Sequence, residues 1–421
     1  MRILHVIPCV MRERGGPTTV VQALSRHQAN AGHDVTVLTT DQGARRGEHA
    51  VELAPAVRLD MHHVRGPHRL AFAPTFRAAL RGHLRRCEVA HVHSIFTYPV
   101  HVTLRDALAA DRPIVLRPCG MLHPYSLRRS RWVKRAYLAL WGRLVRRACT
   151  AWHYTSAQEA EASWPAGGSH LVLRNGIEAA EFALDRAAAR ERVWQRWPQL
   201  EQRPYVVFLA RLHAKKRLDL LLEAFLTGAP ESHRLVVAGP DEGLWPTLVR
   251  RFLGEPAAAR RVHYVGSVGG DDKATLLAGA DLFALPSEHE NFGNAALEAL
   301  AAGTPVLLSP HVDLAPEVER AGFGFTARVD AATWGHRLGD LLTQPERLRV
   351  LADPARAWAR EYFCWARITD ELHRYYERVL RTRSHHAGHR TDAGRPAGQL
   401  PDLHVERGGQ PAPLSGKPPL V

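Results

Sequence analysis

Short apolar runs alternate with segments of helical period, and this alternation occurs twice along the chain. It is the sequence feature that most narrows the possible folds. In the first half the apolar runs are 2–8, 34–40, 88–94 and 112–118. In the second half they are 205–211, 234–240, 261–266, 281–286 and 305–309. A strand, a helix and a second strand in succession form a right-handed parallel unit. The sequence therefore predicts an α/β protein with two doubly wound, Rossmann-like domains.

The length and the interruptions of this alternation predict the domain boundaries. A chain of 421 residues exceeds what one hydrophobic core usually organises. In open parallel sheets the ligand lies beyond the carboxyl ends of the strands, so two such domains would face a central cleft. The predicted parts are a first domain over 1–178, a linker over 179–204, a second domain over 205–353, a C-terminal helix over 354–382 that packs on the first domain, and a disordered tail over 383–421.

Composition excludes several classes of protein. No apolar stretch approaches the roughly 20 residues that cross a bilayer, and the N-terminus becomes charged too soon for a signal peptide. The five cysteines show no C-x-x-C spacing, which argues against a zinc site and against a secreted disulfide scaffold. We therefore expect a cytoplasmic protein with reduced thiols.

The positive charge is concentrated in the first half of the chain. Residues 1–178 contain 25 basic and 12 acidic residues, whereas the remainder contains 31 and 30. Eight basic residues and no acidic residue lie in 126–152, with aromatic and aliphatic side chains at near-helical spacing. This pattern is typical of an amphipathic helix that binds an anionic membrane surface, here through 126–147, and equally of a core-packed helix with a solvated basic face.

Two glutamates, Glu290 and Glu298, have seven residues between them and flank the start of a predicted helix. The turn Phe292-Gly293-Asn294 would present backbone N–H groups at the helix N-terminus to a phosphate or a sugar hydroxyl. An ionised carboxylate at Glu298 could accept hydrogen bonds from a pair of hydroxyls. Taken singly, each glutamate could equally be a solvated surface residue.

A phosphate-bearing ligand also needs positive charge. Arg211 ends a predicted strand and Lys216 follows in the next loop, so a guanidinium fork and a point charge are available there. In the first domain, Gly15 and Gly16 lie in the first strand-to-helix turn, where the backbone could approach the same diphosphate. The Gly-Gly pair lacks the spacing of a dinucleotide-binding or P-loop motif.

Several segments together resemble a known family. They include "GGPTTVVQALSRHQANAGHDVTVLTT", "CGMLHPYSL", "LRNGIE", "FLARLHAKKRLDLLLEAF" and "PSEHENFGNAALEALAAGTPVL". In this order, through about residues 1–380, they resemble family 4 of the retaining glycosyltransferases, the group 1 type with the GT-B architecture. The resemblance implies a hexose-type transfer from a nucleotide sugar, with no other cofactor, to a glycan or lipid-linked acceptor in cell-envelope or exopolysaccharide synthesis.

The resemblance also implies roles for individual residues. Arg211 and Lys216 would neutralise the leaving diphosphate, Glu298 would bind the ribose hydroxyls, and Glu290 would lie near the transferred sugar. The turn would contact sugar and phosphate through its four residues, Asn291, Phe292, Gly293 and Asn294.

The chemistry fits these residue types, with one departure from the family. The main requirement is charge on the leaving group, and the chain has no D-x-D sequence, so we expect transfer without a metal. Retention in such enzymes is ascribed to attack on the same face of the sugar. Many relatives place His or Arg where this chain has Cys119, and a thiol donates hydrogen bonds poorly. His93 and Arg117 are therefore further candidates for the acceptor or sugar side.

Two other functions stay open at this point. A nucleotide-sugar epimerase shares the architecture and would convert a donor with no acceptor present. A nucleic-acid-binding protein is suggested by the charge alone, and the sequence contains no recognisable nucleic-acid-binding module, so we expect no nucleic-acid partner.

Overall fold

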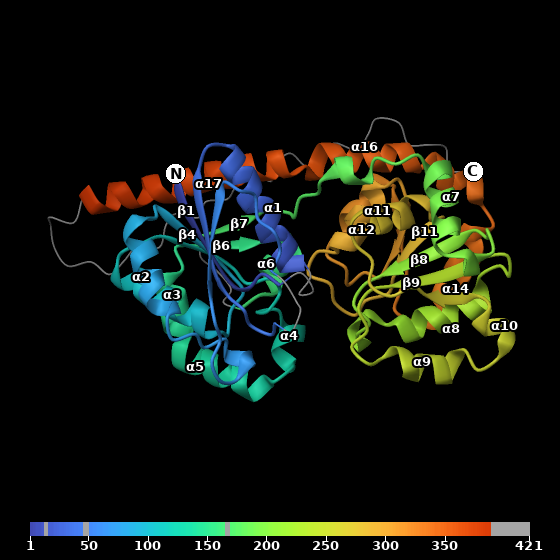
Figure 1. Cartoon of the computed structure of the whole chain (residues 1–421), viewed down its shortest axis with the longest axis horizontal. Coiled ribbons are helices and arrows are strands. Elements are labelled where there is room, and N and C mark those ends of the chain that lie inside the picture. Colours follow the sequence, from blue (N-terminus) through green and yellow to red (C-terminus); the bar gives the residue numbers. More distant parts are fainter. Residues whose placement is uncertain (12–15, 45–49, 165–168, 389–421) are drawn as a thin grey trace. The chain divides into compact units, whose positions relative to one another are not determined.

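The computed structural model describes residues 1–11, 16–44, 50–164 and 169–388, with side chains described up to 382 (Figure 1). The chain forms two compact units: unit 1 contains Met1–Gly176 and the helix that begins at Trp365, and unit 2 contains Ile177–Cys364. Each unit contains a parallel sheet with interleaved helices, which confirms the predicted fold class. Among the described residues, every helix is too short or too polar to cross a bilayer.

Unit 1 is built on a sheet of seven parallel strands in the order β3-β2-β1-β4-β5-β6-β7. The strands are β1 (Arg2–Cys9), β2 (Asp34–Thr40), β3 (Val57–His62), β4 (Val89–His93), β5 (Ile114–Arg117), β6 (Ala151–Tyr154) and β7 (His170–Val172). The chain winds outward from β1 through β2 and β3, then returns to place β4 on the other side of β1. The loops after β1 and β4 therefore diverge at the point where the strand order reverses, the usual ligand position in such sheets.

The helices of unit 1 cover both faces of its sheet. They are α1 (Gly16–Asn30), α2 (Phe76–Arg86), α3 (Tyr98–Ala109), α4 (Pro124–Arg128), α5 (Arg131–Ala148), α6 (Ala157–Ala162) and α17 (Trp365–Gly388). Leu4 and Val6 of β1 belong to the core that includes α2, α3 and α5, whereas Ile3 belongs to the core beneath α1 and α17. Figure 1 shows α1 and α17 on one side of the sheet, and α2 and α3 on the other. This alternation is the period-two pattern of a strand buried on both faces.

Unit 2 contains a six-stranded parallel sheet in the order β10-β9-β8-β11-β12-β13. The strands are β8 (Tyr205–Leu209), β9 (Arg234–Ala238), β10 (Val262–Tyr264), β11 (Leu282–Leu285), β12 (Val306–Leu308) and β13 (Gly324–Thr326). The helices are α7 (Arg186–Arg196), α8 (Leu218–Gly228), α9 (Trp245–Phe252), α10 (Pro256–Ala259), α11 (Gly270–Gly279), α12 (Asn294–Ala301), α13 (Ala315–Ala321), α14 (Ala331–Leu342), α15 (Pro345–Val350) and α16 (Ala352–Phe363). Here the strand order reverses between β8 and β11.

The structure differs from the predicted boundaries at two places. Residues 179–204 are not a linker, because Phe182, Val193 and Leu200 are buried in the core of unit 2. The predicted helix over 354–382 is two helices, α16 in unit 2 and α17 in unit 1, because Cys364 adopts an extended conformation between them. Helix α17 shares a core with β1 and α1 of unit 1 through Trp365, Leu372 and Tyr376. The proposed tail over 383–421 lies outside the described residues beyond the end of α17.

Four strands have no counterpart in the predicted pattern. β3 is an edge strand with mostly exposed or half-buried residues, and β6, β7 and β13 have three or four residues each. Runs this short, or this polar, lack the continuous apolar character by which a buried parallel strand is recognised in a sequence.

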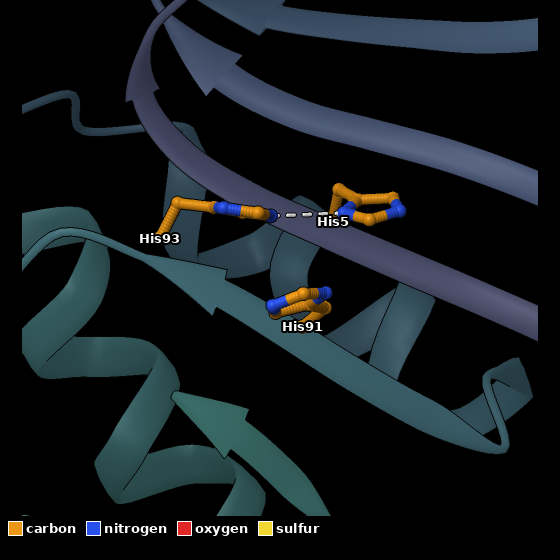
Figure 2. Close-up of side chains that lie close together, drawn as sticks. All are labelled: His5, His91 and His93. Atoms are coloured by element: carbon orange, nitrogen blue, oxygen red, sulfur yellow. Dashed lines mark hydrogen bonds between the residues drawn. The ribbon is translucent and has the colours of Figure 1, made fainter. Parts of the chain in front are cut away.

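Buried histidines lie at the centre of the unit 1 sheet. His5 comes from β1 and His91 and His93 come from β4, and Figure 2 shows the rings of His5 and His93 joined by a hydrogen bond of 3.0 Å. His153 of β6 lies 3.1 Å from the carbonyl oxygen of Leu173 and 3.2 Å from His91. Because a carbonyl can only accept, Nε2 of His153 carries the proton, and Nδ1 accepts from His91.

The same chain of hydrogen bonds continues into the last helix. Nδ1 of His91 accepts from the Tyr376 hydroxyl at 2.6 Å, so side chains of β4, β6 and α17 are linked in one direction of donation. Burial lowers the pKa of His5 to about 4, and that of His153 to about 3. These two rings are therefore neutral at pH 7.

Unit 1 should lose stability in mild acid. A histidine whose pKa is lower in the folded state contributes stability that is complete above its unfolded pKa of about 6.5 and is lost as the pH falls toward the folded value. At pH 5.5 each fully neutral buried histidine should cost about 1.4 kcal/mol of unfolding free energy. Hydrogen exchange read by mass spectrometry should show β1, β4 and β6 losing protection between pH 7 and 5, before β8 and β11 do. Equal loss in both units would contradict this expectation.

Candidate donor site of unit 2

The reversal of strand order brings two loops of unit 2 together. β8 and β11 are parallel neighbours, with Val206 paired to Leu282, so the loops that follow them start side by side. The backbone N–H of Glu288, after β11, donates to the carbonyl of Lys215, after β8, at 2.8 Å. The residues that the sequence assigns to the leaving group and to the sugar thus lie on two loops joined by their backbones.

Lys216 and Glu290 form an ion pair across these loops. Lys216 ends a short 3-10 helix (Ala214–Lys216), and its side chain is only 10% exposed. Burial, together with the nearby charges of Lys215 and Arg211, lowers the pKa of Lys216 well below that of a free lysine. The backbone of Glu290 is held by a hydrogen bond of its N–H to the carbonyl of His311 at 2.9 Å. A lysine and a carboxylate are therefore held together on the two loops that follow β8 and β11.

Glu298 is held by a second lysine. Lys273 of α11 donates to Oε1 of Glu298 on α12 at 2.7 Å, and the side chains are 23% and 18% exposed, respectively. The Lys273 ammonium also lies 5.4 Å from the ring centroid of Phe182, a residue of the 3-10 helix Ala179–Phe182. Each glutamate of the pair thus has a lysine partner from a different part of unit 2.

Arg211 lies in the loop after β8 but pairs with another acid. Its Nη1 donates to Glu242 at 2.7 Å, and both side chains are nearly half exposed. The loops after β8 and β9 are also joined by an isolated bridge between Leu212 and Asp241. An exposed ion pair is weak, so a bound diphosphate could displace the carboxylate from Arg211.

The turn before α12 is partly structural. Phe292 is buried in the core of unit 2, so that only its backbone could face a ligand. Gly293 has φ +99°, and a Cβ atom there would lie 2.7 Å from a methyl carbon of Val312. A glycine is required for both reasons. Asn291 and Asn294 are half-buried on either side of this turn, and α12 begins at Asn294 as predicted.

The candidates in unit 1 lie at the carboxyl ends of β4 and β5. His93 and Arg117 are paired in register, and both are buried. Arg117 donates through Nη2 to Asn175 at 2.6 Å, while its Nε and Nη1 have no partner among the described residues. Cys119 has φ +54°, and its thiol donates to the Arg117 carbonyl at 3.5 Å. Burial raises the pKa of Cys119, so the thiol stays protonated near neutral pH.

The first strand-to-helix turn is described only in part. Gly16 is the first residue of α1 and is exposed, whereas Gly15 lies outside the described residues. The structure brings together Lys216 with Glu290, and His93 with Arg117. It adds two partners that sequence reasoning missed, Lys273 for Glu298 and Glu242 for Arg211.

One group of described side chains has the spacing of metal ligands. Ring nitrogens of His5, His91 and His93 all lie within 4.8 Å of one another. The planes of His91 and His93 are inclined by only 27°, and those of His5 and His93 by 28° (Figure 2). Imidazole lone pairs lie in the ring plane, so near-parallel rings do not converge on a tetrahedral ion. The group fits a hydrogen-bonded core cluster, and transfer without a metal stays a prediction.

Comparison with known families and proteins follows the division of the chain. The family described as "Glycosyl transferases group 1" matches residues 190–358, and the "Glycosyl transferase 4-like domain" matches residues 15–176. The chain is 27% identical over 346 residues to the GDP-mannose:cellobiosyl-diphosphopolyprenol alpha-mannosyltransferase of Xanthomonas campestris, covering 79% of this chain and 85% of that protein. It is 32% identical over 228 residues to the D-inositol 3-phosphate glycosyltransferase of Salinispora tropica, covering 51% of this chain and 47% of that protein.

Two solved structures show the same fold at low sequence identity. Anabaena HepE, in complex with UDP and glucose, matches with a TM-score of 0.71 and 17% identity over 90% of this chain and 99% of that one. The sucrose-phosphate synthase of Thermosynechococcus elongatus matches with a TM-score of 0.73 and 18% identity over 91% of this chain and 100% of that one.

Glu290→Gln should destabilise unit 2 even without a ligand. The substitution leaves the buried ammonium of Lys216 without its carboxylate, which should lower the free energy of unfolding at pH 7 by about 2 kcal/mol. Because Lys216 binds its proton more weakly when folded, stability of the variant should rise from pH 7 to pH 9. Urea unfolding at the two pH values measures both effects.

Glu288→Gln is the matched control, since Glu288 lies two residues earlier in the same loop and its 3.4 Å contact with Arg217 is partly exposed to solvent. Its effect should stay within about 0.5 kcal/mol. Equal effects of the two substitutions would show that the pair with Lys216 contributes nothing particular to unit 2.

Proposed function

The chain belongs to the group 1 glycosyl transferases and has the two-domain GT-B fold, and from this premise we propose that it transfers a hexose from a nucleotide sugar to a glycan or lipid-linked acceptor with retention of configuration. One observation carries the proposal. Glu290 and Glu298 lie beyond the carboxyl end of β11, each paired with a lysine, where the strand order of unit 2 reverses. Ligands of open parallel sheets bind at such a point.

The charges of unit 2 suit a nucleoside diphosphate as leaving group. Lys216 supplies a fixed cation, and Arg211 supplies an exposed guanidinium after the same strand. The start of α12 adds backbone N–H groups that favour an anion. Glu298 would accept hydrogen bonds from the ribose hydroxyls, and Glu290 would face the sugar.

The chemical step then depends mainly on stabilising the departing charge. The bond from the anomeric carbon to the phosphate oxygen breaks, and the sugar acquires oxocarbenium character. The acceptor hydroxyl attacks on the face that the diphosphate leaves, and a phosphate oxygen takes its proton. Lys216 and Arg211 stabilise the diphosphate as its charge develops, which is the role that a metal ion plays in other transferases.

Relatives of the chain indicate which donors and acceptors to test. Curated relatives are named as GDP-mannose-dependent enzymes, including one that acts on a diphosphopolyprenol-linked disaccharide, and the structurally similar HepE was solved with UDP-glucose. GDP-mannose, UDP-glucose and a polyprenyl-diphosphate-linked glycan are therefore the first substrates to examine.

An exposed apolar and basic surface on α5 of unit 1 supports the proposal of a lipid-linked acceptor. In the structure the predicted basic helix is α4 followed by α5, and Tyr137, Leu138 and Leu144 pack on the core as a buried helix would. Trp132, Val133 and Leu140 instead point outward, with at least 67% of each residue exposed. The exposed apolar groups lie among arginines with no acidic residue on the helix. We propose that this surface binds anionic lipid at the inner face of a membrane.

Lys216→Met should abolish most of the transfer. Without the cation, the departing diphosphate loses its nearest charge, and kcat should fall by about 100- to 1,000-fold. Lys215→Met, one residue earlier, should have a much smaller effect because it leaves the ion pair of Lys216 with Glu290 in place. Steady-state transfer from the best donor of a nucleotide-sugar panel measures both variants.

Two results would overturn the proposal. The first is a chain that neither binds nor hydrolyses any nucleotide sugar of the panel and is unaffected by Glu298→Ala. The second is conversion of the donor sugar to its epimer with no acceptor present, which would identify an epimerase. The anomeric configuration of the product, read by NMR, tests retention separately.

Vesicle flotation tests the membrane surface. Replacing Arg131, Arg135 and Arg143 by Gln should weaken partitioning onto anionic vesicles by about 100-fold, since each cation near the surface contributes about 1 kcal/mol. Trp132→Ser with Leu140→Ser should weaken binding at high salt as well. Replacing the exposed Arg250, Arg251 and Arg260 of unit 2 by Gln removes the same charge and should change little. Equal loss in both triple variants would reject a specific surface.

A further inference from the structure

The structure assigns Lys273 as the positioning residue for the ribose-binding carboxylate of Glu298, a deeper reading that rests on the function proposed above. Lys273 would hold one carboxylate oxygen and leave the other for the ribose hydroxyls, so that it controls the preference for ribonucleotides over deoxyribonucleotides. No part of the sequence pattern points to this lysine, which precedes Glu298 by 25 residues and lies on another helix.

The two carboxylate oxygens of Glu298 differ in their hydrogen bonds. Oε1 accepts from the Lys273 ammonium at 2.7 Å. Oε2 makes no hydrogen bond to any side chain or backbone group that the structure describes, and the side chain is 18% exposed. A carboxylate with one oxygen hydrogen-bonded can still accept a hydrogen bond from a ligand hydroxyl through the other.

Lys273 is itself held in place from a second direction. Its ammonium lies over the ring of Phe182 at 5.4 Å, within the range of a cation–π contact. Phe182 is 2% exposed and belongs to the core of unit 2. The lysine therefore contacts a buried aromatic ring as well as the carboxylate, and the two contacts together limit the rotamers of a residue that is otherwise flexible.

This arrangement answers an electrostatic difficulty of the site. A carboxylate near a diphosphate repels it. An unpaired Glu298 would therefore lower the affinity for the nucleotide even though it binds the ribose hydroxyls. The pair with Lys273 makes the local charge close to zero. Hydrogen bonds from the ribose to Oε2 are retained, because a paired carboxylate still accepts through its second oxygen.

Asp272, the residue before Lys273, takes no part in the contact with Glu298. Asp272 of the same helix pairs with Arg196 at 3.4 Å, and both side chains are about half exposed. That pair joins α7 to α11 on the surface and does not include Glu298. Asp272→Asn therefore breaks an ion pair of α11 without touching the carboxylate, and serves as the matched control.

The test compares nucleotides that differ by one hydroxyl. The full chain is titrated calorimetrically with UDP and GDP, and then with the 2′-deoxy and 3′-deoxy forms of the tighter of the two. The unaltered chain should bind the ribonucleotide at least about tenfold more tightly than one of the deoxy forms, as expected for a hydrogen bond to a charged group. Lys273→Met should reduce this ratio to less than about threefold, whereas Asp272→Asn should preserve it.

The ratio separates positioning from a loss of structure. A damaged fold would weaken ribo and deoxy forms together, and thermal unfolding without nucleotide checks the fold of each variant. Lys273→Arg keeps a cation and should retain most of the discrimination. If Lys273→Met does not fold, Lys273→Gln, which keeps a neutral donor, gives the same comparison with an expected intermediate ratio.

The outcomes distinguish this inference from the proposed function. Nucleotide binding by the unaltered chain, with the same ratio in Lys273→Met, overturns the role of Lys273 alone. Binding with no preference for ribose in the unaltered chain overturns the clamp at Glu298 together with its positioning residue, and leaves nucleotide binding intact. An unaltered chain that binds neither UDP nor GDP, nor any other donor nucleotide, overturns both.

Discussion

Parallel pairing of β8 with β11 is the constraint on which the candidate site depends. The crossovers from these two strands lead to opposite sides of the sheet, so their loops begin together and then separate. Lys216 and Glu290 are 74 residues apart in sequence, yet they meet because each follows one of these strands. The backbone bond from Glu288 to Lys215 then keeps the loops in register.

Glu290 and Glu298 are each paired with a lysine that compensates the carboxylate charge. A carboxylate that helps to bind a phosphorylated ligand must not repel it, and in both cases a lysine compensates its charge. The partners differ in origin, since Lys216 comes from the adjoining loop and Lys273 from the preceding helix. Lys216 is the more buried of the two lysines. Loss of its pair with Glu290 should therefore lower the stability of unit 2 as well as the rate of transfer.

Prediction from the sequence found the fold, because buried parallel strands depend on local pattern, and it selected Lys216 and Glu290, which pair in the structure. Apolar runs identify buried parallel strands, and Gly293 and Asn294 mark a helix start. It missed Lys273 and Glu242, because a lysine on a helix or an acid in a loop gives no local sign of its tertiary partner. It also assigned 179–204 to a linker, since Val193 and Leu200 are too widely spaced among polar residues to suggest a core.

The break at Cys364 has a consequence for how the chain is made. Residues 1–176 of unit 1 are synthesised before unit 2, but Trp365 and Tyr376 of the same core follow unit 2 in the sequence. Until α17 emerges, the face of the sheet that it shares with α1 is covered only in part, and His91 lacks the hydroxyl that donates to it. Unit 1 is thus completed only after unit 2 has had the opportunity to fold, and a chain shortened before residue 365 would leave the part of that face beneath α17 exposed.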